Sequence, residues 1–213
     1  MKNMGLSRLV LVSPGEWKTP EAQAMAWNSR EILEGAEVHH DLQTAVGNTG
    51  LLLGTSSRTA RRKPLSPEQG ARLLLKSAKK NEVSILFGPE DKGLSNEDLA
   101  LCHSHIVIPA SSKYPSLNLA QAVAIVCYEL LRASQKGQSP DSRNLASIRD
   151  LEGFFAHLKD ILIKTKFLDP RRGADFMGDI KGIFQRAILS RREVRILRGV
   201  LRQIEWWKDY ETK

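Results

Sequence analysis

Three short segments of the sequence combine small polar residues with glycine or proline. They are GTSSR (54–58), FGPEDKGLS (87–95) and IPASSKYPSLN (108–118), and each follows or ends an apolar run. Small polar residues after a strand are often only a turn, so each segment alone is a weak signal. In open α/β sheets, however, ligands bind beyond the carboxyl ends of the strands. We therefore expect the three segments to meet at one ligand site.

The second segment limits the kind of ligand. Gly88 and Gly93 have the glycine spacing of a phosphate-binding P-loop, but Leu94 stands where that loop requires lysine. Glu90 and Asp91 add negative charge, which would repel a polyphosphate. No G-x-G-x-x-G motif follows any predicted strand, which disfavours a Rossmann dinucleotide site. A nucleoside without phosphates fits better, and a cationic one fits best.

The elements around these segments alternate between strand and helix patterns. Apolar runs rich in Val, Ile and Leu predict strands at 9–13, 51–57, 83–88 and 105–110, and helices are predicted at 20–35 and 66–81. This alternation favours a parallel sheet covered by helices. Residues 114–134 predict a helix that is apolar almost all round and hence buried, with Ser116 as a possible cap.

Composition is that of an ordinary globular protein. The chain has 213 residues, 41% hydrophobic and 26% charged, enough for one α/β domain with a small appendage. No apolar run approaches the ~20 residues that span a bilayer, and the N-terminus lacks a signal-peptide cleavage pattern. Cys102 and Cys127 are far apart, which indicates free buried thiols in a cytoplasmic protein without a membrane partner.

Positive charge is concentrated at the C-terminal end. Of the net charge of +8, residues 151–213 carry +5 and residues 1–150 carry +3. A polar linker is predicted at 135–150, followed by amphipathic helices at 151–168, 174–189 and 192–207. One side of the last helix carries four arginines: Arg191, Arg195, Arg198 and Arg202. This stripe suits an acidic partner such as nucleic acid, and a merely solvated face is the alternative.

Taken in order, the three segments resemble the conserved motifs of the SpoU-type RNA 2′-O-ribose methyltransferases of the SPOUT superfamily. Residues 151–213 resemble the helical extension of the TrmJ-type branch. The resemblance implies an α/β methyltransferase domain at 1–134 with a parallel sheet, helices on both faces and a C-terminal trefoil knot. It also implies S-adenosylmethionine as cofactor, tRNA as partner, methylation of a ribose in the anticodon loop, a homodimer, and no metal.

The resemblance also assigns residues. The cofactor would be bound by Thr55, Ser56, Ser57, Gly88, Ile108, Pro115, Ser116 and Leu117. Asn118, Glu90 and Ser116 would lie beside the reacting ribose. Arg58, Arg61 and Arg62, which follow the first segment, join the C-terminal arginine stripe as candidate RNA contacts.

The sequence departs from the family at its start. Family members carry a first strand and a catalytic arginine ahead of the position that matches Met1. Either residues upstream of Met1 are missing from this sequence, which we favour, or the protein has lost that chemistry. The alternatives are therefore an RNA-binding protein of the same fold without turnover and a nucleotide-dependent enzyme of doubly wound fold.

Other chemically interesting residues have ordinary explanations. The five histidines show no metal-ligand spacing, although His103 and His105 would share one face of a strand. Trp206 and Trp207, at the end of the last predicted helix, are expected to take part in packing or a dimer contact rather than in base stacking.

Overall fold

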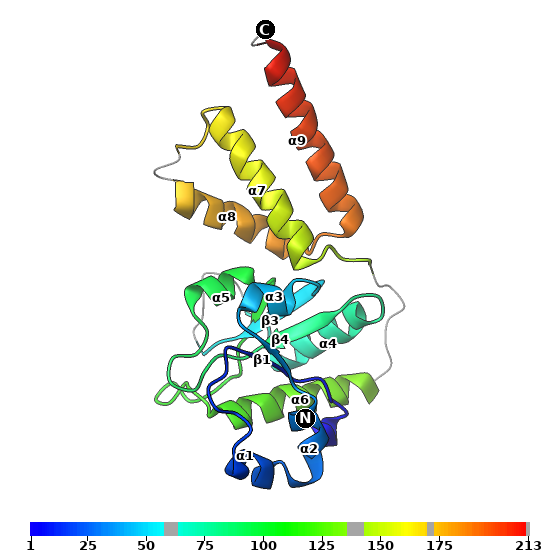
Figure 1. Ribbon diagram of the computed structural model, residues 1–213, viewed down its shortest axis with the longest axis vertical. Coiled ribbons are helices and arrows are strands. Elements are labelled where there is room, and N and C mark those ends of the chain that lie inside the picture. The colour runs from blue at the N-terminus through cyan, green and yellow to red at the C-terminus, as the bar shows by residue number, and fades with distance from the viewer. Residues whose placement is uncertain (58–63, 136–142, 170–172, 212–213) are drawn as a thin grey trace.

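The computed structural model describes residues 1–57, 64–135, 143–169 and 173–211 (Figure 1). Its strands are β1 (Val10–Val12), β2 (Glu37–His39), β3 (Leu51–Thr55), β4 (Val83–Leu86) and β5 (Ser104–Ile106). The helices of the first two thirds are η1 (Lys2–Met4), α1 (Pro20–Met25), η2 (Trp27–Ser29), α2 (Arg30–Glu34), α3 (Leu42–Val46), α4 (Pro67–Ala78), α5 (Asn96–Leu101) and α6 (Leu119–Gln135). The last third consists of α7 (Ile148–Lys164), α8 (Gly173–Ala187) and α9 (Arg191–Glu211).

The strands form two parallel sheets rather than the single sheet that the sequence predicted. One has the order β4-β3-β5, and the other pairs β1 with β2. In the described part of the chain no ladder joins β1 to β4. A side-chain bridge spans the two sheets instead, because Arg8 binds Glu37 at 2.7 Å and Glu82, just ahead of β4, at 2.8 Å. The α/β class and the parallel pairing are confirmed.

The centre of the larger sheet is buried on both sides. Leu51, Leu52 and Leu53 of β3 are 0% exposed, as expected for a parallel strand with both faces covered. Leu51 and Leu53 pack with α4 and α6. Leu52 points the opposite way and packs with Val46 of α3, with Cys102 and with Ile148 of α7. Helices therefore cover both faces of this sheet.

Local signals explain where several helices start. Ser66 caps α4 through the backbone N–H of Gln69, whose side chain in turn accepts a hydrogen bond from the N–H of Ser66. This capping box fixes the beginning of the helix. The helix predicted at 20–35 is wrong as one unit, since α1, η2 and α2 divide it. Asn28 and Ser29 lie at that break, and such residues compete with the helical backbone for hydrogen bonds.

Helix α6 is less buried than the sequence predicted. Only Val126, Cys127 and Leu130 are buried, on the side that packs against α4 and the sheet. Tyr128 is 50% exposed, and Ala120 and Ala124 share its exposed face at helical spacing. The expectation of burial all round is therefore wrong for a single chain.

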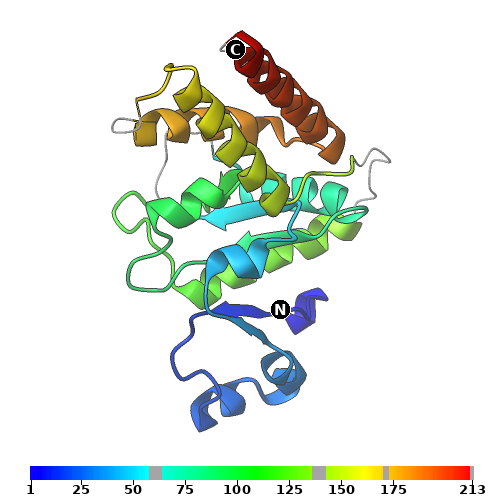
Figure 2. The same ribbon diagram turned by 45° about the horizontal axis from the view of Figure 1, so that its top comes forward.

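Helices α7, α8 and α9 are confirmed as amphipathic and pack on one another (Figures 1 and 2). Their common core contains Phe154 and Phe155 of α7, Phe184 of α8, and Val194 and Leu201 of α9. At the start of α9 Ser190 and Glu193 form a capping box, because they exchange hydrogen bonds.

The segment before α7 is attached to the α/β part. Leu145 is buried in the core shared by β3, α4 and α6, and its N–H donates to Asn81 Oδ1 at 2.6 Å. The N–H of Ile148 donates to the carbonyl of Thr49 at 3.0 Å. Residues 143–148, within the segment predicted as a linker, thus hold the C-terminal helices against the sheet.

Two further sequence expectations can be compared with the described residues. Cys102 and Cys127 are both buried and are not joined in a disulfide, as predicted. Among the described residues, no helix is both long enough and apolar enough to cross a membrane.

Candidate functional site

The three predicted segments meet at a cavity of about 190 Å³. Its walls come from the carboxyl ends of β3, β4 and β5 and from the start of α6. All eight residues predicted to bind the cofactor line it: Thr55, Ser56, Ser57, Gly88, Ile108, Pro115, Ser116 and Leu117. Parallel strands end at one edge of a sheet, which is why segments far apart in the sequence converge there.

The first segment ties the strand ends together. The Thr55 hydroxyl donates to the carbonyl of Leu86 at the end of β4, at 3.1 Å. The N–H of Ser56 donates to the carbonyl of Ile106 at the end of β5, at 3.0 Å. The first contact uses the Thr55 side chain and the second uses the backbone of residue 56. The first segment therefore lies at the ends of the three strands, and the other two segments complete the cavity wall.

The second segment closes on itself, which explains its two glycines. Gly93 has a φ of +67°, in the left-handed region that favours glycine, and its N–H donates to the carbonyl of Pro89 at 2.8 Å. A Cβ on Gly88 would lie 2.3 Å from both Gly93 C and Leu94 N. The loop can fold this tightly only without a side chain at position 88, and it presents Glu90 and Asp91 to the cavity.

The third segment joins the second through a side-chain contact. The amide of Asn118 donates to Glu90 Oε1 at 3.0 Å. Its carbonyl oxygen accepts from the N–H of Ala120 at 2.9 Å, which caps α6. Asn118, and not Ser116, is therefore the residue that caps this helix. Ser116 lines the cavity instead.

The charge of the cavity wall is negative. Two carboxylates, Glu90 and Asp91, line it together with one ammonium group, that of Lys92, which lies 3.7 Å from the Asp91 carboxylate. This balance opposes a polyphosphate and suits hydroxyl groups, amino groups or a cation. Backbone groups of the glycine and proline loops can approach a ligand closely on the remaining sides.

Sequence reasoning missed several residues of the wall. Leu119 and Ala122 line the cavity from the first turn of α6, three residues apart on one helix face. Asp91 and Phe87 line it from the second segment. The sequence could have indicated Leu119 and Ala122, because a helix capped by Asn118 has these two residues in its first turn, next to the loops.

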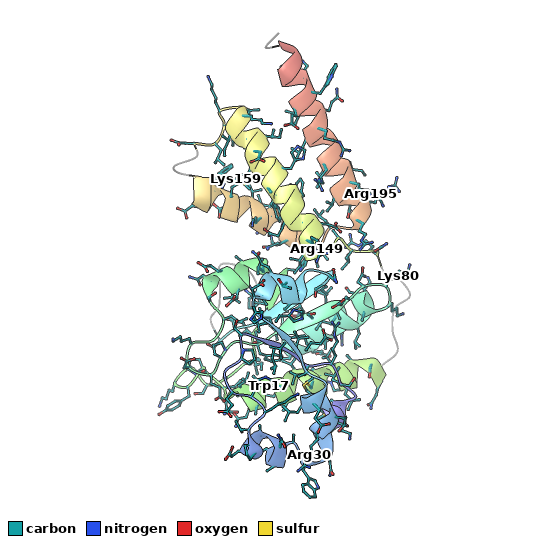
Figure 3. The ribbon with its side chains drawn as sticks, viewed as in Figure 1. Trp17, Arg30, Lys80, Arg149, Lys159 and Arg195 are labelled. Atoms are coloured by element: carbon teal, nitrogen blue, oxygen red, sulfur yellow. The ribbon has the colours of Figure 1, made fainter. Side chains whose placement is uncertain are left out.

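The C-terminal arginines lie away from the cavity. Arg191, Arg195, Arg198 and Arg202 are all exposed on α9. Arg191 faces Asp150 of α7 at 3.8 Å. Figure 3 shows Arg195 on the outer side of the lower part of α9, above the α/β part, and Arg30 at the lower end of the molecule. The other predicted RNA contacts, Arg58, Arg61 and Arg62, lie outside the described residues.

The histidine pair has a structural explanation. His103 and His105 are both buried. His103 Nδ1 accepts a hydrogen bond from the N–H of Leu52 at 3.1 Å, and His105 Nε2 lies 3.3 Å from the carbonyl of Leu99. Among the described residues, no group of three or more His, Cys, Asp or Glu side chains could hold a metal ion.

These features define an α/β ligand-binding protein whose strand-end loops form one polar, carboxylate-bearing cavity. Residues 1–128 match the SpoU rRNA Methylase family, and residues 149–213 match the C-terminal domain of the tRNA methyltransferase TrmJ. The chain belongs to the SpoU rRNA methylase family, which confirms the prediction from its motifs.

Known relatives are similar over almost the whole chain. The tRNA (cytidine/uridine/adenosine-2′-O-)-methyltransferase TrmJ of Pseudomonas aeruginosa is 37% identical, over 96% of this chain and 86% of its own. The tRNA (cytidine/uridine-2′-O-)-methyltransferase TrmJ of Cronobacter sakazakii is 36% identical, over 96% and 87%. The crystal structure of TrmJ from Z. mobilis superposes with a TM-score of 0.81 at 33% identity, covering 96% of this chain and 90% of that one.

Proposed function

We propose that this chain is an S-adenosylmethionine-dependent RNA methyltransferase that methylates a ribose 2′-hydroxyl of tRNA. The observation that carries the proposal is the convergence of the three motif segments on one cavity, together with the hydrogen bond between Asn118 and Glu90. Membership of the SpoU family and the tRNA 2′-O-methyltransferase activity named for its relatives support it. As a tRNA-modifying enzyme, it would work in the cytoplasm, where tRNA is found.

The cavity fits the cofactor by its chemistry. A sulfonium cation carries one positive charge and no phosphate, and the wall carries more carboxylates than ammonium groups. Thr55, Ser56 and Ser57 would line one edge of the cofactor, and the backbone at Gly88, Ile108 and 115–117 would hold it on the others. When bound, the cofactor would supply an electrophilic methyl carbon on a sulfonium leaving group, and the ribose oxygen would be the nucleophile.

The chain's own residues would orient the hydroxyl and remove its proton. Asn118 holds one oxygen of the Glu90 carboxylate at 3.0 Å, which leaves the other oxygen able to accept the 2′-hydroxyl proton. Ser116, in the same wall, would hydrogen-bond the ribose. Positioning then accounts for most of the rate increase, because the displacement needs the oxygen in line with the carbon–sulfur bond.

We assign tRNA affinity mainly to the C-terminal helices. Exposed arginines of α9 would neutralise phosphates of the RNA backbone, as would Arg58, Arg61 and Arg62, which follow the first segment in the sequence. The proposed organisation is a methyltransferase domain at 1–134, a connecting segment at 135–150 whose last part packs on the α/β core and begins α7, and a helical extension at 151–213. The two family matches, at 1–128 and 149–213, support this division.

A trefoil knot is also part of the proposal. Strand β5 has β3 on one edge, and on its other edge the N–H of Leu65 donates to His105 and the N–H of Val107 donates to Leu65. The β5 segment therefore lies between residues 55–56 on one edge and residue 65 on the other, and both of these precede it in the sequence. Helix α6 then packs against α4, which follows residue 65 in the sequence. A threaded chain would have this arrangement.

We also propose a homodimer, and the exposed side of α6 supports it. The helix has an apolar composition, but only one of its sides is covered within the chain. A second copy that covered Ala120, Ala124 and Tyr128 would complete its burial. Light scattering should give twice the chain mass of 23.8 kDa, and a particle of one chain mass at micromolar concentration would contradict the dimer.

The function is tested by binding and by methyl transfer. Calorimetric titration should show binding of S-adenosylhomocysteine and no binding of NAD or ATP. Incubation of tRNA with methyl-labelled S-adenosylmethionine should place the label on a ribose. Binding of NAD or ATP in place of S-adenosylhomocysteine would reject the proposal.

A further inference from the structure

Helix α9 places its two adjacent tryptophans in different surroundings. Arg198 and Arg202 are four residues apart, and the same step leads from Arg202 to Trp206. Residues four apart lie on one side of a helix, so Trp206 continues the arginine stripe toward the C-terminal end of α9. Its side chain is 60% exposed. The stripe therefore ends in an accessible indole ring.

Trp207 lies on a different side of the same helix. It continues an apolar row with Ile196, Val200 and Ile204, at spacings of three and four residues. Its exposure of 56% is close to that of Trp206. Two neighbouring tryptophans thus have almost equal accessibility, but only one of them adjoins the arginines.

The charges around the stripe are favourable to an anion. Within the described part of the chain, Arg195, Arg198 and Arg202 form no ion pair. The carboxylate nearest along the helix, that of Glu205, contacts Lys164 of α7 and lies 3.4 Å from His157 Nε2. The neighbouring acidic group is therefore neutralised by α7, and the arginine side chains remain available to phosphates.

We propose that Trp206 is a stacking residue for an unpaired base of the RNA substrate, held there by phosphate contacts of Arg195 and Arg202. The proposal rests on the function proposed above. Proteins that bind single-stranded nucleic acid combine a basic surface with exposed aromatic rings, on which bases of any identity stack. The α9 face has both parts in register, since one helical turn separates Arg202 from Trp206.

The position of Trp206 determines which step it affects. Helix α9 extends from the α/β part to the far end of the molecule, whereas the loops of the cavity lie on the α/β part itself (Figure 1). A base stacked on Trp206 is therefore not the nucleotide bound at the cavity of the same chain. Trp206 should contribute to RNA affinity and KM, while kcat at saturating RNA should stay unchanged.

The test compares Trp206→Ala with Trp207→Ala in the full chain. The probe is fluorescein-labelled tRNA, titrated by fluorescence anisotropy at several salt concentrations. We expect W206A to bind about 5- to 150-fold more weakly, the range found when a stacking aromatic is removed. We expect W207A to stay within about twofold of the wild type, because stacking needs a ring beside the phosphate contacts.

Two features distinguish stacking from general damage. W206A removes no charge, so the slope of affinity against salt should stay as in the wild type, unlike that of an arginine variant. Trp206→Phe keeps an aromatic face and should restore most of the affinity. S-adenosylhomocysteine affinity should be equal in all three variants, since the cavity is far from α9.

Each outcome decides between the proposals. Wild-type affinity in W206A, or equal losses in W206A and W207A, would reject the stacking role and leave the methyltransferase function standing. A loss in W206A that phenylalanine does not restore would also reject it. Failure of the wild-type chain to bind tRNA would reject both.

Discussion

Replacing Gly88 with alanine is the most direct perturbation of the cavity. The new Cβ would lie 2.3 Å from Gly93 C and Leu94 N and 2.7 Å from Gly93 O. All three atoms belong to the backbone, so no side chain can turn away to make room. Non-bonded carbon atoms pack at about 3.5 Å or more, so the backbone at residue 88 and the backbone at residues 93–94 must move apart by roughly 1 Å.

The expected cost follows from that displacement. Forcing an extra methyl group into a packed site costs about 1–3 kcal/mol. For a chain of this size, each kcal/mol lowers Tm by about 2–4 °C, so G88A should melt about 2–12 °C lower than the wild type. The loop also carries Glu90 and Asp91 to the cavity wall. Loss of one or two ligand hydrogen bonds, each worth about 0.5–1.5 kcal/mol, would weaken S-adenosylhomocysteine binding by about tenfold.

Thermal melting and calorimetric titration with S-adenosylhomocysteine measure both effects. Gly15→Ala is the matched control, because a Cβ there would meet nothing within 4 Å. That variant should melt and bind like the wild type. If G88A also matches the wild type in both measurements, the tight closure of the loop is not required, and the explanation of its glycines is wrong.

Three other predictions concern α9, α6 and the contact of α7 with α9. The double variant Arg195→Glu, Arg198→Glu should bind tRNA more weakly, and its affinity should depend less on salt. Its affinity for S-adenosylhomocysteine, measured by calorimetry, should be unchanged. Unchanged tRNA affinity would mean that the arginine stripe is only a solvated face. Asn118→Asp keeps an oxygen that can cap α6, so its Tm should stay within about 2 °C of the wild type. The variant places a second carboxylate beside Glu90, so methyl transfer should fall at least tenfold. Wild-type activity would exclude a role for the contact between Asn118 and Glu90. A hydrogen bond and the charge of Lys164 on α7 lower the pKa of Glu205. The ionised Glu205 side chain therefore stabilises the fold above about pH 4.3, and this stabilisation is lost as the pH falls through the lowered pKa. Glu205→Gln should therefore lower Tm at pH 7 and lower it progressively less as the pH falls through the lowered pKa, and an equal decrease at every pH would contradict the ionic explanation.

The convergence of the motif loops could be predicted because it depends on a general property of parallel sheets. Strands β3, β4 and β5 were each recognisable as a short apolar run, and these three strands end at the same edge of their sheet. Thr55, Gly88 and Ser116 could therefore be placed together from the sequence, and the structure has them in one cavity wall. The contact of Asn118 with Glu90 could not be derived in the same way, since it depends on how two loops fold over the strand ends.

Short or polar elements were not predictable. Strand β2 consists of Glu37, Val38 and His39, which show no apolar run, and it exists because its backbone pairs with β1. The segment at 145–148 was predicted to be linker because of its polar surroundings. Leu145 and Ile148 nevertheless fill spaces in the α/β core. In both cases a distant segment supplies the partner that stabilises the element.

By itself, the sequence determined the properties that depend on neighbours along the chain. The capping boxes at Ser66 and Ser190, the amphipathic rows of α9 and the glycines of the second loop all follow from spacing over a few residues. Tertiary structure alone decided which apolar surface is covered. The composition of α6 predicted burial on every side, but in the described part of the chain α4, η1 and the sheet cover one side of it, and Tyr128 stays exposed. Burial is a property of what packs against a residue, and the number of elements available to pack is settled by the whole fold.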